Sequence, residues 1–384
     1  MRPATRTFIR QRFSDYYKNG ILFPPSSIAQ REFGFIFFDR TYPDDIRMKR
    51  HIGLFSPEEM ETYIRNLVPA HAYYSTAYYE NPGAPTMQEK NWSGADLIFD
   101  LDADHIMRGR YDAMLERIKQ ETYKLLDVLT DELGFQKQTI NIVFSGGRGY
   151  HIHVSDIAFR TWTSPERREI IDYVCGVGIQ PKAMVSQYRI GTTGWPRRFR
   201  DTLLAYFEQI TTYNEAALHS ELISYEGVGD IRARRFIQML PDICSRLRND
   251  PCSINMNDQT VEAILNAMCL DPKGAFYHQC RQSGVQADEP VTTDIKRLIR
   301  LPGSLHAKSG FRVVPLTIKE LPDFNPLVDA VVFSDRDMVI ESAGSFEMSL
   351  LDNQYHIDKG LNTVPEALGM FLCCRGMGEV TGDV

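Results

Sequence analysis

Several common signals are missing from this 384-residue chain, and each absence narrows the choice of protein class. No uninterrupted apolar stretch reaches the roughly 18 residues of a membrane span, and the basic N-terminus lacks the apolar core of an export signal. None of the seven cysteines forms a CxxC pair, and their odd number favours reduced thiols buried as small apolar residues. We therefore expect a cytoplasmic protein with no membrane segment.

An excess of positive charge is also missing, since 43 lysines and arginines stand against 50 aspartates and glutamates, for a net charge of −7. This balance argues against nonspecific nucleic-acid binding over the whole surface, because binding to phosphates needs local positive potential. Basic clusters at 197–200 and 232–235 lie beside Trp195, Phe199 and Phe236. They could hold a template strand and stack its bases, although a solvated helix face explains such clusters more often.

The first stretch that carries chemistry is a hydrophobic strand running straight into acids, IFDLDAD at Ile98–Asp104. Alternation along a strand places Asp100 and Asp102 on the same face, with Cα atoms about 6.6 Å apart. Two like charges so close repel each other, and a divalent cation turns that repulsion into attraction. Oxygen ligands of this kind suit Mg²⁺ or Mn²⁺. A bare DxD is equally compatible with a solvated strand end or a helix cap.

The second stretch, SGGRGYHIHV at Ser145–Val154, predicts a strand, a tight glycine turn and another strand. Its glycines let backbone N–H groups approach an anion, while Ser145 can donate a hydroxyl proton and Arg148 a charged fork. His151 and His153 fall on one face of the second strand. Taken alone, a glycine hairpin with one arginine is more often only a turn.

The third stretch begins at Asp288 and adds basic residues. The spacing of Asp294 and Arg297 predicts a helix that ends at the following Pro-Gly pair, and a surface ion pair is favoured over a catalytic role for these two residues. Beyond the break, His306 and Lys308 alternate along an extended segment, so both can point at one ligand. Basic groups two residues apart, beside a lone carboxylate, suit a triphosphate.

Together these residues resemble the small catalytic subunit of the archaeal and eukaryotic type of DNA primase. The family's hydrophobic DxD strand and SGxRGxH motif are followed by a third carboxylate, a basic element and a PxSxHxKxG turn. The matching positions are Asp100, Asp102, Ser145, Gly146, Arg148, Gly149, His151, Asp288, Arg300, Pro302, Ser304, His306, Lys308 and Gly310. Family-like sequence also occurs in RFSDYY, REFGF, RHIGLF and YYSTAYYENP, so the resemblance covers nearly the whole chain.

The resemblance implies template-directed synthesis of short RNA primers on single-stranded DNA, with a large primase subunit as the partner in a heterodimer. It implies that Asp100, Asp102 and Asp288 are catalytic and hold two divalent ions, Mg²⁺ or Mn²⁺. The residues expected to bind the triphosphate of the incoming nucleotide are Ser145, Arg148, His151, Arg300, His306 and Lys308. Arg50 is a further candidate for this pocket by its place in the family pattern, but a surface charge is the favoured interpretation.

One departure from the family concerns zinc. Many members carry a knuckle of cysteines and a histidine soon after the DxD strand, yet the stretch Ala103–Phe135 contains no cysteine. Elsewhere, Cys252, Cys269, His278 and Cys280 are too loosely spaced for more than a weak zinc signal. We therefore expect the fold to close without structural zinc.

Two other classes fit part of the pattern. A haloacid-dehalogenase-like phosphatase also has a hydrophobic strand before DxDx[T/V], but Asp104 occupies the position that needs Thr or Val. A nonenzymatic RNA-recognition-motif-like (RRM-like) nucleic-acid-binding domain would carry aromatic residues on its central strands, where this chain has Asp100 and Asp102. Both alternatives are less consistent with the three stretches taken together.

The expected fold class is α/β (α+β), with a small mixed β-sheet catalytic core of the primase type and a mostly helical insertion. The core contains an RRM-like strand–helix–strand element, predicted at Leu97–Leu101, Tyr111–Leu133 and Ile140–Ser145. The predicted ranges are 1–195 and 281–384 for the core and 196–280 for the insertion.

Overall fold

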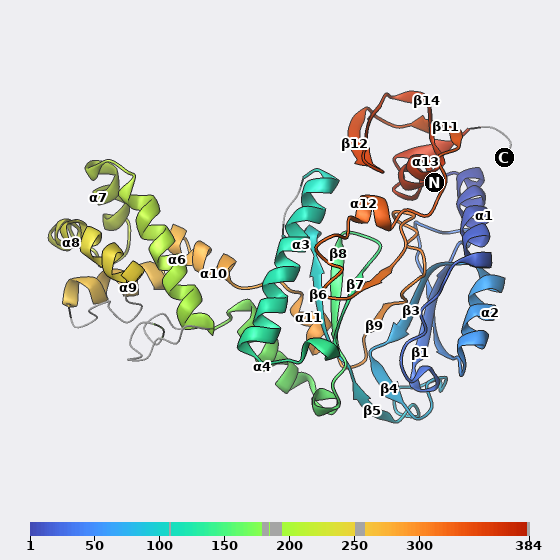
Figure 1. Ribbon diagram of the computed structural model, residues 1–384, viewed down its shortest axis with the longest axis horizontal. Helices are drawn as coiled ribbons and strands as arrows, with labels where there is room; N and C mark the ends of the chain where they lie inside the picture. Colours follow the sequence, from blue (N-terminus) through green and yellow to red (C-terminus); the bar gives the residue numbers. More distant parts are fainter. Residues whose placement is uncertain (107–108, 179–183, 185–193, 250–257, 382–384) are drawn as a thin grey trace. The chain divides into compact units, whose positions relative to one another are not determined.

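The computed structural model describes residues 1–106, 109–178, 184, 194–249 and 258–381. The chain forms two units. The sheet unit comprises Met1–Tyr123, Gln136–Arg168 and Ala287–Val384, and the helical unit comprises Lys124–Phe135 and Glu169–Gln286. Small sheets and helices alternate along the chain, so the α+β class expected from the sequence is confirmed (Figure 1).

The first sheet of the sheet unit has four antiparallel strands in the order β2-β1-β3-β9. Its strands and the two helices packed beside them are β1 (Glu32–Phe37), β2 (Met48–Gly53), β3 (Pro69–Ser75), β9 (Leu298–Arg300), α1 (Pro3–Asn19) and α2 (Pro57–Leu67). Helix α2 begins where the sequence predicts, because the Ser56 side chain accepts a hydrogen bond from the N–H of Glu59. Pairing of β3 with β9 sets Tyr73 opposite Arg300.

The second sheet carries the first two sequence motifs and has the order β10-β7-β8-β6. Its strands are β6 (Leu97–Asp102), β7 (Ile140–Phe144), β8 (Gly149–Val154) and β10 (Val314–Leu316). Antiparallel pairing of β6 with β8 sets Asp100 opposite His151 and Asp102 opposite Gly149. Helix α3 (Tyr111–Asp127) connects β6 to β7 and runs on as a π-helical turn, η3 (Val128–Glu132). The predicted strand–helix–strand element is therefore confirmed.

The segment after Asp288 differs from the expected helix over 294–301. A short helix, α11 (Glu289–Thr293), ends earlier, and Leu298–Arg300 form strand β9. The helical spacing of a few residues is outweighed here by pairing with the open edge of β3, which satisfies backbone N–H and C=O groups. The segment that carries His306 and Lys308 is likewise a turn and not an extended strand, since the N–H groups of Ser309 and Gly310 both donate to the His306 carbonyl.

The C-terminal part of the sheet unit adds a three-stranded sheet, a hairpin and a buried helix. These elements are α12 (Pro326–Asp329), β11 (Asp337–Ser342), β12 (Phe346–Leu350), β13 (Asn353–Ile357), β14 (Gly360–Pro365), α13 (Glu366–Cys374) and β15 (Gly378–Val380). The last strand is tied to the first helix, because Val380 N–H donates to Thr5 Oγ1 at 3.0 Å. A further hairpin pairs β4 (Ala77–Tyr79) with β5 (Trp92–Ala95), and 3₁₀ turns cover Ile28–Gln30, Ala103–His105, Lys137–Thr139 and Ile157–Phe159.

The helical unit contains the part of α4 (Ser164–Cys175) from Glu169 onward, together with α6 (Gly194–Thr211), α7 (Glu215–Ile223), α8 (Asp230–Asn249), α9 (Gln259–Leu270) and α10 (Ala275–Ser283). Trp195, Phe199 and Phe236 are buried, so these rings are not available to stack bases beside the two basic clusters. Arg198 pairs with Glu132. The predicted boundaries of the insertion, 196–280, remain a prediction.

Two further expectations concern cysteines and membrane segments. Four cysteines in the described part are buried and two are partly exposed, while Cys252 lies outside the described residues. None of the helices in the described ranges is both long and apolar enough to span a bilayer.

Candidate active site

The three predicted acids come from two elements of the sheet unit. Asp100 and Asp102 lie on the same face of β6, and Asp288 directly precedes α11. The Asp288 N–H donates to the Asp100 carbonyl at 2.9 Å, which fixes the start of α11 against the acidic strand. The structure thus brings together acids nearly two hundred residues apart in the chain.

Asp100, Asp102 and Asp288 form the acidic end of the site, and Asp100 is the acid whose pKa is raised by burial and by the other two. Burial, followed by the negative charges of Asp102 and Asp288, raises the pKa of Asp100 to about 7, while Arg297 and Arg300 act in the opposite direction. Its side chain is only 20% exposed and lies 3.2 Å from His151, measured from Oδ1 to Nε2. A carboxylate held among like charges gains most from a cation, so these acids fit a divalent metal ion.

The acids do not form a complete ligand set by themselves. Within the described residues, no group of three or more His, Cys, Asp or Glu side chains is arranged to hold a metal ion. One oxygen of Asp102 accepts a hydrogen bond from the Asp104 N–H at 3.0 Å, and Asp100 faces His151. Magnesium-type sites usually complete their octahedron with waters and substrate phosphates, so an incomplete protein set is consistent with a metal bound together with a nucleotide.

The glycine turn between β7 and β8 forms the next part of the site. Gly146 has φ +73°, and an added Cβ would lie 2.8 Å from Cβ of His306, so a side chain is excluded on both grounds. Ser145 Oγ accepts from the Gly147 N–H at 3.3 Å. Arg148 forms an ion pair with Asp104. The Tyr111 hydroxyl donates to the Gly147 carbonyl at 2.6 Å and ties α3 to the turn.

The basic residues of the third stretch lie against this turn. Arg300 donates to His71 Nδ1 at 2.9 Å, and its guanidinium lies 5.0 Å from the centre of the Tyr73 ring. His306 is buried, and burial together with the charge of Arg300 holds its pKa well below the usual range, so the ring is neutral. Lys308 is exposed.

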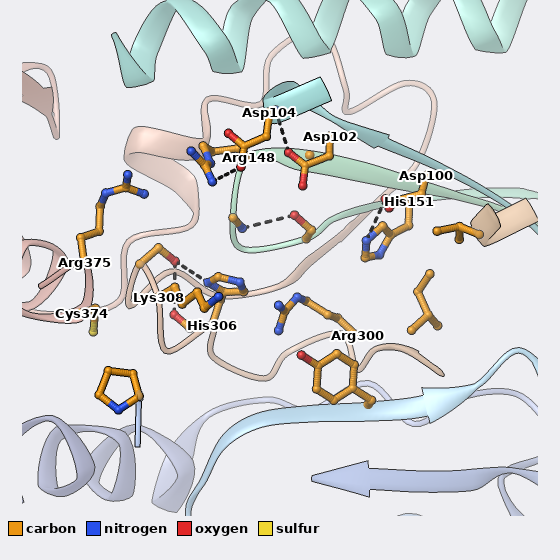
Figure 2. A pocket seen from close by; sticks show the side chains of 18 of the residues that line it. Asp100, Asp102, Asp104, Arg148, His151, Arg300, His306, Lys308, Cys374 and Arg375 are labelled. Carbon is orange, nitrogen blue, oxygen red and sulfur yellow. Dashed lines mark hydrogen bonds and ion pairs between the residues drawn. The ribbon is translucent and has the colours of Figure 1, made fainter. Parts of the chain in front are cut away.

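A pocket of about 640 Å³ joins the acidic and basic ends (Figure 2). Eight of the nine predicted residues line it, and these are Asp100, Asp102, Ser145, Arg148, His151, Arg300, His306 and Lys308. The ninth, Asp288, does not line the pocket but contacts the backbone of Asp100. The expected convergence of the three stretches is therefore found.

Several pocket residues were missed by sequence reasoning. Tyr73 and Arg297 line the pocket, and so does Arg375, which belongs to no motif. His71 lies behind the lining as the acceptor for Arg300, and its alternation with Tyr73 along β3 is a sequence signal that places the two side chains on one face. The favoured interpretation of Asp294 and Arg297 as a surface ion pair is wrong, because no ion pair joins these two described residues: Asp294 accepts a hydrogen bond from the Lys296 N–H, and Arg297 lines the pocket.

Arg50 also differs from the expectation of a free surface charge. It forms two hydrogen bonds to the fully buried carboxylate of Glu32, at 3.0 and 3.2 Å. Buried Lys90 contacts the same carboxylate at 3.3 Å. Arg50 is not part of the pocket wall, so its function is to compensate a buried charge in the first sheet.

Acids at one end of a pocket and a row of basic groups at the other are typical of metal-dependent phosphoryl- or nucleotidyl-transfer enzymes. Comparison with known proteins narrows this class. The family model for the DNA primase small subunit matches residues 99–318. The chain belongs to this family.

Relatives named DNA primase small subunit PriS match over nearly the whole chain. The protein from Methanospirillum hungatei is 57% identical over 382 residues, covering 100% of this chain and 98% of the relative. Those from Methanoregula boonei and Methanosphaerula palustris are 50% and 49% identical, each covering 99% of this chain, with 100% and 99% of the relative covered. The family resemblance expected from the motifs is confirmed, and neither the phosphatase nor the nonenzymatic alternative finds support.

The chain is therefore a DNA primase catalytic subunit, a nucleotidyltransferase that makes RNA primers. Catalysis of this type depends on divalent metal ions.

Proposed function

We propose that the pocket of Figure 2 is where this subunit joins nucleoside triphosphates into a primer on a single-stranded DNA template. The observation that supports this most is the continuity of the pocket from Asp100 and Asp102 to Lys308. A 3′-hydroxyl attacks the α-phosphate, and the bond from that phosphorus to the β-phosphate oxygen breaks. Negative charge grows on the entering and the leaving oxygens, so a site with cations at both ends favours the transition state.

At the acidic end, Asp100, Asp102 and Asp288 would hold the divalent ions, Mg²⁺ or Mn²⁺. Bound ions supply charge stabilisation at the attacking and leaving oxygens. His151 was expected to contact the triphosphate, but its position 3.2 Å from Asp100 supports a role in orienting that carboxylate. Burial holds the pKa of His151 well below its usual range, so the ring stays neutral and leaves the negative charge of Asp100 for a cation.

At the basic end, Ser145, Arg148, Arg300, His306 and Lys308 would bind the triphosphate. Arg300 is already oriented by His71, and Lys308 is exposed to the pocket. Arg148 is held by Asp104 and must exchange that carboxylate for a phosphate when the nucleotide binds. Arg148 is paired with an anion before and after the nucleotide binds, first with the Asp104 carboxylate and then with a phosphate, so the exchange replaces one ion pair by another.

The proposal includes two macromolecular partners, a large primase subunit and the DNA template. The relatives are named small subunits, which supports a large primase subunit as the partner of this chain. The net charge of −7 favours weak, salt-sensitive contact with the template outside the site, which suits an enzyme that must release DNA often.

The test is incorporation of labelled nucleotide on a single-stranded DNA template, with Mg²⁺, with Mn²⁺ and with a chelator. We expect Asp102→Asn to lower incorporation at least about 1000-fold, because it removes a carboxylate charge that would hold a divalent ion. Asp335→Asn, on an exposed residue outside the pocket, is the matched control and should keep wild-type activity. Full activity of the Asp102 variant would rule out this pocket as the site.

A further inference from the structure

Arg375 enters the pocket from a part of the chain that carries none of the motifs. It directly follows α13, whose residues are buried from Ala367 to Cys374, and its N–H donates to the Phe371 carbonyl at 3.1 Å. The family model ends at residue 318, well before this helix. The guanidinium lies 5.3 Å from the ring centre of Tyr111 and 5.7 Å from that of Phe371. Two rings on buried or anchored elements therefore hold this cation in place.

Arg375 forms no ion pair within the described part of the chain. Arg148 beside it pairs with Asp104, whereas no described carboxylate lies within ion-pair distance of Arg375. Desolvation and the charge of Arg148 lower the pKa of Arg375, while Tyr111 and Asp104 act in the opposite direction, and the side chain stays exposed to solvent. Arg148 and Arg375 therefore repel each other, and Asp104, already paired with Arg148, offsets this only in part. Figure 2 shows the Arg375 side chain at the Arg148 side of the pocket, away from Asp100. An anion between the two arginines would relieve this repulsion.

A chain of contacts gives the position of Arg375 along the pocket. Starting beside the acidic end, Arg300 contacts His71, whose ring centre lies 5.0 Å from that of His306. His306 Nε2 lies 3.5 Å from the point where Gly147 would carry a Cβ. The Gly147 carbonyl accepts from Tyr111, and Arg375 covers the Tyr111 ring. Arg375 is therefore at the opposite end of this path from Arg300, which is the end that lies near Asp100.

We propose that Arg375 binds the terminal phosphate of the incoming nucleoside triphosphate, an assignment that rests on the proposed function of the pocket. With the α-phosphate at the acids, the β- and γ-phosphates extend along the basic row, and Arg375 meets the last of them. After transfer that phosphate is the distal half of the pyrophosphate. Arg375 thus selects triphosphates over diphosphates, since a diphosphate ends before it reaches the guanidinium.

The experiment measures equilibrium binding of a nucleoside triphosphate and of the matching diphosphate to the full chain, with Mg²⁺ present. We expect Arg375→Gln to weaken triphosphate binding about ten-fold, the worth of one charge-assisted contact, and to change diphosphate binding less than about two-fold. Arg336→Gln, an exposed arginine of the same C-terminal region outside the pocket, is the matched control and should change neither. Equal losses for both ligands, or no loss for either, would overturn the assignment.

Two further variants test whether a loss of triphosphate binding comes from the lost charge of Arg375 or from lost packing, and whether the pocket binds nucleotides at all. Arg375→Met keeps an apolar stem against Tyr111 and Phe371, so a triphosphate-specific loss shared by the Gln and Met variants cannot come from lost packing. Arg300→Gln should weaken both ligands if the pocket binds nucleotides at all. If Arg300→Gln weakens binding and Arg375→Gln does not, only the role of Arg375 fails. If neither variant weakens binding, the proposed function of the pocket fails as well.

Discussion

The two ends of the pocket are built in different ways. The acidic end rests on regular structure, because Asp100 and Asp102 are fixed by the pairing of β6 with β8 and the backbone of Asp288 is hydrogen-bonded to β6. Most of the basic end rests on turns and a helix end, since Arg148 and Lys308 lie in turns and Arg375 follows α13, while Arg300 is the last residue of β9 and is hydrogen-bonded to His71. Metal ions demand fixed distances, whereas a flexible triphosphate can be bound by groups that adjust. The following predictions test this difference, starting with the largest expected effect.

Neutralising the acidic end should abolish activity while it stabilises the metal-free protein. The pKa of Asp100 is raised from 3.8 to about 7 in the folded state, so ionisation destabilises the fold increasingly as the pH rises from about 4 to 7. We expect Asp100→Asn to lower primer synthesis at least about 1000-fold and to raise the free energy of unfolding in chelator by on the order of 1–3 kcal/mol at pH 8. Thermal unfolding at pH 8 and pH 4 checks the sign.

The gain in stability should fall to well under about 1 kcal/mol at pH 4, where Asp100 is protonated in the folded state and about half ionised in the unfolded state. Asp335→Asn is the control and should show no pH-dependent gain, because Asp335 is exposed. An Asp100→Asn variant that is less stable than wild type at pH 8 would show that the ionised Asp100 carboxylate does not destabilise the fold.

At the basic end, the glycine turn should be the most sensitive point. Gly146→Ala puts a Cβ 2.8 Å from His306 on a residue with φ +73°, so we expect a loss of about 1–3 kcal/mol and at least about twenty-fold weaker triphosphate binding. Gly134→Ala separates strain from the clash, since Gly134 has φ +71° with no atom within 4 Å of the added Cβ. If both variants bind nucleotide normally, the turn does not shape the basic end.

The link between His71 and Arg300 should have an intermediate effect. His71→Phe keeps a ring of similar size but removes the acceptor, so we expect KM for the nucleotide to rise about five- to twenty-fold with little change in kcat. His71→Asn offers a side-chain oxygen as acceptor and should recover part of the loss. Steady-state kinetics on a fixed template measure both. Equal KM values for the Phe and Asn variants would mean that the ring matters for packing alone.

The smallest effect should be a gain. Asp104 holds Arg148 before the nucleotide arrives, so Asp104→Asn should tighten triphosphate binding about two- to five-fold by removing an internal competitor. Asp112→Asn, which frees Arg110 outside this pocket, is the control and should leave binding unchanged. Weaker binding by the Asp104 variant would show that the carboxylate assists the site.

The acidic end could be predicted from the sequence because its residues are placed by short-range features of the chain. Alternation along one strand places Asp100 and Asp102 together, and the glycines between two apolar runs predict the hairpin that adjoins them. The basic end could be predicted only where the family motif supplied residues. His71 and Arg375 reach the site through the pairing of β3 with β9 and through the packing of α13, and no short pattern reports either event.

The helix predicted over 294–301 was wrong because strand pairing, which no short pattern reports, decides the structure of this segment. Asp294 and Arg297 have helical spacing, but the edge of β3 offers Leu298–Arg300 backbone partners that lie more than two hundred residues away in the chain. Local spacing cannot report such a partner, and only the tertiary fold decides between helix and strand.

The register of β6 against β8 sets a limit on how this segment can change in length. Side chains alternate along β6, so deletion or insertion of one residue before Asp100 would turn both acids toward the opposite face of the sheet. A change of two residues would return both acids to the original face but shift them by two positions along β8, so that Asp100 would no longer lie opposite His151. Evolution can therefore vary the residues of β6 more freely than their number.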